Sequence, residues 1–145
     1  MTTHAHYEDT SSDSTFDSTF AVLGDEQYLS LTTFRKSGER VSTPMWVVRD
    51  GDALVMFTPE ESAKVKRLRN SPRVELRPCN QVGRVKDGVD PVTGMAEVLT
   101  DEDSLERATR MIRRKYGFAY RVVMGIERLI KFGSQKRVTL RITRG

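Results

Sequence analysis

The chain has 145 residues and a formal net charge of +4, and 37% of its residues are hydrophobic. This length predicts one domain with a single modest core, and no stretch approaches the roughly 20 apolar residues that span a bilayer. The only cysteine is Cys79, which excludes an intramolecular disulfide and favours a cytoplasmic protein.

Thr, Ser and Asp dominate the first 19 residues, which show neither helical nor strand periodicity. Such a segment buries too little apolar surface to offset the entropy cost of ordering it. We therefore expect a disordered polar tail at 1–19 and a folded domain at 20–145. The tail lacks the basic start and apolar run of a signal peptide.

Alternation of apolar and polar residues predicts six strands. Gly38 and Gly51 fall between the first three, where hairpin turns favour a positive φ. Pro44 lies within the second strand and lacks an N–H, so we expect that strand at an edge, at a bulge or beside a ligand. The predicted strands cover residues 27–34, 41–49, 53–58, 73–79, 92–100 and 137–143.

Helical periodicity follows the third and fifth strands. The first helix would start at Pro59, bury Val65 and Leu68, and end before a proline. Gly117 is predicted to cap the second helix. The predicted helices cover residues 59–70, 101–116 and 118–132, after a helical lead-in at 20–26. This order predicts a mainly β, α+β fold: a six-stranded antiparallel barrel flanked by helices.

A candidate anion site follows the third strand. Thr58, Ser62 and Lys64 offer two hydroxyls and an ammonium around a helix start, where backbone N–H groups and the helix dipole favour negative charge. A partly desolvated Lys–phosphate contact contributes about 1.5–3 kcal/mol. Alternatively, Lys64 is an exposed helix lysine, Thr58 a strand end and Ser62 an ordinary helix residue.

Conventional catalytic groups are scarce. Both histidines, His4 and His6, lie in the tail, which excludes a Ser-His-Asp triad, a Cys-His pair and a histidine zinc site from the folded region. We therefore predict no metal site and expect a cofactor that brings its own chemistry. Cys79 is interpreted as a small buried apolar residue.

A basic run follows the first predicted helix start. It lacks the interleaved aromatic residues of a single-strand nucleic-acid platform, so we interpret it as a solvated face and expect no nucleic-acid partner. Its members are Lys66, Arg67, Arg69, Arg73 and Arg77.

The order of these elements resembles the pyridoxamine-phosphate-oxidase-like, FMN-binding split barrel, and more narrowly the PPOX-class F420-dependent oxidoreductases. The resemblance covers about residues 20–143 and is fairly specific in combination, although no single segment is. It rests on YLSLTTF at 28–34, VSTPMW at 41–46, KVKRLRNSPRV at 64–74, PC at 78–79 and RRKYG at 113–117.

This resemblance implies a homodimer with a flavin or deazaflavin in a groove between two barrels. Lys64, Thr58 and Ser62 would contact the cofactor phosphate. Arg84 is a further candidate contact, in a loop where relatives often show Arg-Gly-Arg and this chain has Gln81-Val82-Gly83-Arg84. The strand residues that would line the ring are Ser42, Thr43, Pro44, Met45 and Trp46.

The resulting hypothesis is an F420H2-dependent reductase that transfers a hydride to a small conjugated substrate of the quinone, enone or tetrapyrrole type. One or two residues of the basic run could meet the acidic tail of the deazaflavin. The alternatives are an FMN-binding oxidase or reductase of the pyridoxamine-phosphate-oxidase type, and a non-catalytic flavin- or tetrapyrrole-binding module. No catalytic side chain is identified: Tyr116 and Tyr120 could donate a proton, but packing is the commoner role of a tyrosine in a helix stripe.

Overall fold

The computed structural model describes residues 19–131 and 136–145. The predicted disordered tail lies outside them except for its last residue, as do the final residue of the predicted last helix and Gly133, its predicted cap. A helical lead-in at residues 19–22 continues into the 3-10 helix η1 (Leu23–Asp25), as predicted. The helices are α2 (Ala63–Asn70), α3 (Glu102–Tyr116) and α4 (Phe118–Lys131).

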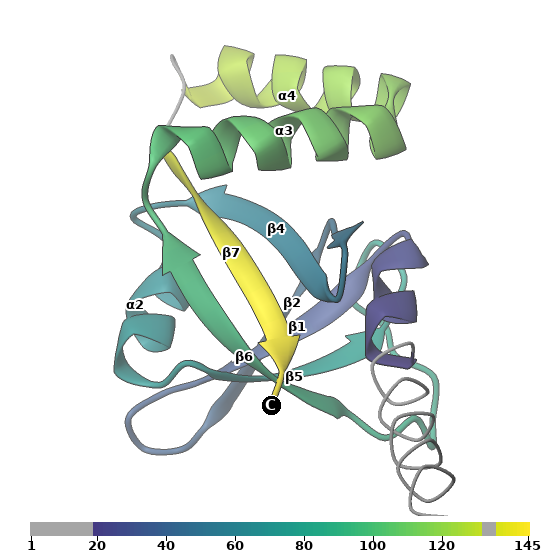
Figure 1. Ribbon diagram of the computed structural model, residues 1–145, viewed down its shortest axis with the longest axis vertical. Helices are drawn as coiled ribbons and strands as arrows, with labels where there is room; N and C mark the ends of the chain where they lie inside the picture. Colours follow the sequence, from purple (N-terminus) through teal and green to yellow (C-terminus); the bar gives the residue numbers. More distant parts are fainter. Residues whose placement is uncertain (1–18, 132–135) are drawn as a thin grey trace, which may run out of the picture.

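Seven antiparallel strands form one sheet in the order β2-β1-β5-β6-β7-β4-β3 (Figure 1). They are β1 (Leu29–Phe34), β2 (Arg40–Met45), β3 (Val48–Asp50), β4 (Ala53–Pro59), β5 (Arg73–Pro78), β6 (Val92–Leu99) and β7 (Arg137–Arg144). A flat sheet of this size would separate its edges by about 29 Å. Its edge strands β2 and β3 are joined by two residues, which span at most about 10 Å. The sheet must therefore curl into a split barrel.

The predicted strand over residues 41–49 is divided in two, which adds one strand to the six expected. The break falls at Trp46 and Val47. Up to Met45 the chain pairs with β1, and from Val48 it pairs with β4. Between them the backbone N–H of Val47 bonds to the Tyr116 hydroxyl instead of to a strand. Tyr116 of α3 lies 69 residues from Val47 in the sequence. Local periodicity cannot show this contact, which stabilises the corner between β2 and β3.

Helix α2 begins later than predicted. Pro59 is the last residue of β4, where it lies opposite Arg137 of β7. The pairing is extended by the N–H of Glu60, which donates to the carbonyl of Lys136. Because these long-range bonds keep the chain extended, the helix starts only after Ser62, its N-cap. The predicted burial of Val65 and Leu68 is confirmed.

The turn predictions at Gly38 and Gly51 and the cap predicted at Gly117 are confirmed. Gly38, Gly51 and Gly117 have φ of 90°, 62° and 53°, values that favour glycine. Asp101 accepts the N–H of Ser104 and so caps α3. None of the helices in the described part of the chain is long and apolar enough to cross a membrane.

Two hydrophobic clusters hold the fold together. The first fills the barrel, and Leu68 of α2 joins it, so α2 closes one part of the barrel interior. The second lies between β3, β4 and α3 and includes Val55, Ile112 and Tyr116. In Figure 1, α3 lies over the strands and α4 forms a further layer on its outer side.

Candidate functional site

Lys64 lies on the first turn of α2 and is half-buried. Desolvation lowers its pKa below 10.5, and the nearby charge of Arg67 lowers it further. Arg67 is turned toward the sheet, where its Nε donates to Thr33 Oγ1 at 2.7 Å. Among the described residues, neither cation forms an ion pair with a carboxylate. Two adjacent cations without a counter-ion suit an anionic ligand.

Ser62 and Thr58 lie beside this pair of cations in the sequence. The Ser62 hydroxyl is buried, has no hydrogen-bond partner among the described residues and does not cap α2, although Ser62 is the N-cap residue. Thr58 is 3% exposed, at the end of β4. An unpaired hydroxyl and an unpaired ammonium at a helix start are donors that fit a phosphate. The alternative of a fully exposed Lys64 is wrong.

The candidate ring-lining residues of β2 differ in accessibility. Ser42 and Pro44 are exposed, and Thr43 is half-buried on the alternate face. Ser42 Oγ lies 2.7 Å from Thr32 Oγ1 of the paired strand. Since β2 is an edge strand, no other strand in the described part of the chain pairs with the backbone groups on its outer edge. This edge can hydrogen-bond a planar ligand.

Met45 and Trp46 point into different parts of the core. Met45 belongs to the cluster inside the barrel and is buried. Trp46 is half-buried and stacks on Tyr116, with 4.5 Å between ring centroids, and it also lies near Tyr120. Both side chains are therefore largely occupied by core packing. They would support a ring site by fixing the end of β2, and they offer a ligand little exposed side-chain surface.

Lys115 holds the corner between β2 and β3, a role that the helical stripe did not reveal. Its Nζ donates to the carbonyls of Gly24, Glu26 and Val47 at 2.8, 2.5 and 2.7 Å. Two of these carbonyls lie in the N-terminal segment and the third lies at the corner, and all are far from Lys115 in the sequence. Only the folded chain therefore shows that this lysine joins the N-terminal segment, the corner and α3.

Tyr116 completes the same corner. Its hydroxyl accepts the N–H of Val47 at 2.9 Å, and its single proton has the carbonyls of Gln27 at 2.7 Å and Val47 at 3.1 Å as acceptors. Burial raises the pKa of Tyr116 to about 12. The hydroxyl is thus committed to the backbone, and Tyr116 serves packing and not proton donation.

Arg84 lies in the loop that follows β5. The side chain of Asn80 orders this loop by accepting the N–H groups of Val82 and Arg84 at 3.0 and 2.9 Å. A Cβ atom at Gly83 would lie 3.4 Å from Pro44 Cδ, so the loop lies against β2. Arg84 also borders an open hollow of about 920 Å³ with half-buried Cys79. The structure therefore brings the Arg84 loop and β2 together.

The basic run is only partly a solvated face. Lys66 and Arg69 are exposed as predicted, but Arg67 and Arg77 are half-buried, and the interpretation is wrong for them. Cys79 is half-buried and not fully buried, and burial raises the pKa of its thiol. Within residues 19–131 and 136–145, no three His, Cys, Asp or Glu side chains are grouped to hold a metal ion.

Comparison with known proteins identifies the fold. A family model described as pyridoxamine 5'-phosphate oxidase matches residues 17–143. No curated protein sequence matches the chain. A candidate pyridoxamine 5'-phosphate oxidase from Listeria innocua is 21% identical with a TM-score of 0.59, and the match covers 88% of this chain and 91% of that one.

Two further solved structures illustrate the range of such proteins. An F420 reductase is 17% identical with a TM-score of 0.55, over 87% of this chain and 93% of that one. The heme storage protein HutZ from Vibrio cholerae is 12% identical with a TM-score of 0.61, over 85% and 84% of the two chains. Identities this low show a shared fold only.

Proposed function

This chain belongs to the pyridoxamine 5'-phosphate oxidase family, and we propose that it is a reductase that uses reduced F420 to transfer a hydride to a small conjugated substrate. The observation that supports a phosphate-bearing cofactor is the half-buried Lys64, which lies beside Arg67 and has no carboxylate partner in the described part of the chain. The choice of F420 rests on the resemblance of the sequence to the F420-dependent oxidoreductases. A protein gains nothing in stability from such an ammonium unless an anion binds it.

Lys64, Ser62 and Thr58 are proposed to hold the cofactor phosphate. The Lys64 ammonium supplies charge, and the Ser62 hydroxyl, unpaired in the protein, donates a hydrogen bond. The dipole of α2 adds a smaller term of about 0.3–1 kcal/mol. Together these groups fix one end of the cofactor.

The edge strand β2 is proposed to orient the ring. Its outer backbone edge is free for hydrogen bonds, and Ser42, Thr43 and Pro44 provide the adjoining surface. The loop that carries Arg84 lies against Pro44 and would exclude water from that side. When bound, the deazaflavin supplies the hydride, and the protein holds it against the substrate.

FMN is the second candidate cofactor, because the chain belongs to the pyridoxamine 5'-phosphate oxidase family and its sequence resembles the FMN-binding split barrel. The Lys64 site does not discriminate, since both cofactors present a phosphate. A cytoplasmic setting is proposed from the lone cysteine, which suits a reducing compartment.

A homodimer is proposed from the surface of α4. Phe118, Val122, Val123 and Ile126 are 80, 42, 43 and 51% exposed on this helix. An apolar helix surface of this kind suits a subunit interface. We expect Val122→Glu with Ile126→Glu to shift the species in light scattering from dimer to monomer, while Arg121→Glu on the same helix does not. A monomeric wild-type protein would contradict the dimer.

The test of the cofactor site uses Trp46, the only tryptophan. F420 and FMN are titrated separately while Trp46 fluorescence is followed. We expect F420 to bind more tightly, and Lys64→Ala to weaken binding about 10- to 100-fold. Lys66→Ala, an exposed lysine on the same helix, is the matched control and should bind normally.

The outcomes separate the alternatives. Tighter binding of FMN assigns the protein to the flavin oxidases or reductases. Binding of F420 without hydride transfer to a panel of quinones and enones indicates a storage or carrier module. Equal binding by wild type and Lys64→Ala would show that the phosphate lies elsewhere.

A further inference from the structure

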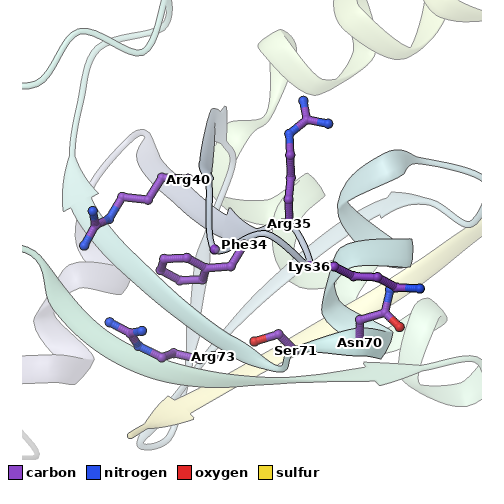
Figure 2. Close-up of a pocket in the computed structure, with 8 residues that line it drawn as sticks. Phe34, Arg35, Lys36, Arg40, Asn70, Ser71 and Arg73 are labelled. Atoms are coloured by element: carbon purple, nitrogen blue, oxygen red, sulfur yellow. The ribbon is translucent and has the colours of Figure 1, made fainter.

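A basic hollow lies between the β1–β2 turn and the start of β5 (Figure 2). Its volume is about 570 Å³. Four of its eight lining residues are cations, and none is a carboxylate. The lining residues are Phe34, Arg35, Lys36, Gly38, Arg40, Asn70, Ser71 and Arg73.

Two of these cations are held in place by the fold. Arg40 Nε and Arg73 Nη2 donate to opposite oxygens of Glu75, each at 3.1 Å. Their guanidinium carbons lie 5.8 and 4.7 Å from the centre of the Phe34 ring. In Figure 2 the ring of Phe34 lies between the two arginine side chains. The guanidinium groups are therefore ordered before any ligand arrives, which lowers the entropy cost of binding.

The hollow keeps a net positive charge after its internal pairs are counted. Glu75 is 7% exposed and does not line the hollow, so its carboxylate lies behind the guanidinium groups. Glu39 pairs with Arg35 at 2.7 Å. Four cations thus face two carboxylates. The C-terminal end of α2 contributes only about half a negative charge.

Most of the donors on the two arginines remain available. A guanidinium has five N–H donors, and the structure gives Arg40 and Arg73 one side-chain hydrogen bond each among the described residues. Fixed guanidinium forks match the oxygens of phosphates and carboxylates. Asn70 and Ser71, at the C-terminal end of α2, add neutral polar groups to the lining.

We infer that this hollow is a second anion-binding site, for a group with two or more acidic oxygens such as a diphosphate or paired carboxylates. Its lining includes none of the residues proposed to hold the phosphate at Lys64, although Arg35 lies near enough to Arg67 for its charge to lower the pKa of Arg67. The anion could be a separate small molecule or the far end of a ligand whose phosphate is at Lys64. In both cases the arginines would bind a group that carries two or more acidic oxygens.

The direct test follows the side-chain Nε–Hε signals of Arg40 and Arg73 by NMR during titration with inorganic pyrophosphate. The titration is done in the Lys64→Ala protein, so that the first site does not contribute. We expect saturable shifts of both signals. Arg73→Gln should weaken binding about tenfold, and Arg69→Gln, an exposed arginine on α2 outside the hollow, should leave it unchanged.

A second variant covers the case in which Arg73→Gln unfolds the protein by leaving Glu75 with one partner. Arg35→Gln with Lys36→Gln changes only exposed turn residues and should weaken pyrophosphate binding about fivefold. Absence of saturable shifts, or equal affinity for pyrophosphate with and without this double change in the Lys64→Ala protein, would overturn the proposal.

Cofactor titrations then identify the source of the anion. If Arg73→Gln weakens F420 but not FMN, the hollow receives the carboxylates of the longer cofactor. If it weakens only pyrophosphate, the natural ligand is a separate polyanion. Failure of both cofactors to bind wild type would remove the proposed function and leave the pyrophosphate result standing.

Discussion

Two half-buried lysines show how differently the two sides of this molecule use a cation. Burial lowers the pKa of both Lys64 and Lys115. Lys115 donates to three backbone carbonyls, and the charges of Asp25 and Glu26 oppose the effect of burial. For Lys64 the nearby charge is Arg67, which adds to the effect of burial.

This difference separates a structural cation, Lys115, from Lys64, the cation proposed to bind a ligand. An ammonium whose donors are all satisfied stabilises the fold at the corner between β2 and β3. An ammonium placed beside another cation is a cost to the free protein, and the cost is relieved when an anion binds. The same reasoning applies to the basic hollow. Each oxygen of Glu75 already accepts a hydrogen bond from an arginine, whereas Arg40 and Arg73 keep further N–H donors for a ligand.

Lys115→Met should have the largest effect on stability. The variant removes three charge-assisted hydrogen bonds and leaves three carbonyls without their partner. We expect the free energy of unfolding to fall by about 3 kcal/mol, as measured by urea denaturation. Lys66→Met on the exposed face of α2 is the control. If both variants are equally stable, Lys115 is not a structural cation.

Tyr116→Phe should be the next most damaging change. It keeps the ring that stacks on Trp46 but removes the hydroxyl from Val47 and Gln27. We expect a loss of about 1–2 kcal/mol, with a change in Trp46 fluorescence of the folded protein. In the wild-type protein, an alkaline absorbance titration should show one tyrosine that ionises at about pH 12. This transition should be absent from Tyr116→Phe.

Cofactor affinity should fall at alkaline pH because of Lys64. Its pKa in the free protein lies below 10.5, and a bound phosphate favours its protonated form. Affinity is therefore full below the pKa of the free protein and declines as the pH rises through it, by up to about tenfold per pH unit. Trp46 quenching by F420 measures this. Lys64→Arg should remove the decline, because arginine stays charged.

Lys64→Met should have the smallest effect on stability, opposite in sense to Lys115→Met. Removal of a desolvated cation beside Arg67 should leave the free energy of unfolding unchanged or raise it by up to about 0.5 kcal/mol. Thermal denaturation without phosphate measures it. A loss above about 1 kcal/mol would show that Lys64 has a stabilising partner in the free protein. Lys64 would then be a structural cation like Lys115.

Local patterns predicted the order of the elements well. Alternation located most strands, and the spacing of Val65 and Leu68 identified the buried face of α2. Errors arose where distant partners decide the backbone. The β2–β3 break depends on Tyr116, and the late start of α2 depends on the pairing of Pro59 with β7.

For the candidate site, the sequence indicated Lys64, Ser62 and Thr58 because they follow one another closely at a helix start. It did not indicate the cluster of Arg40, Glu75 and Arg73, because β2 and β5 meet only through β1. The basic run contains no aromatic residue in the sequence. In the folded chain, however, Phe34 of β1 lies against the guanidinium group of Arg73.

The sequence by itself determined the fold class and the approximate position of the helix start where we propose an anion site, because periodicity, glycine turns and caps act within a few residues. The tertiary structure alone decided which cations are satisfied. Strand order and sheet curvature bring Lys115 to its carbonyls, give Arg40 and Arg73 a shared carboxylate, and place Lys64 beside Arg67. Desolvation and long-range pairing decide these roles, and both exist only once the barrel has closed.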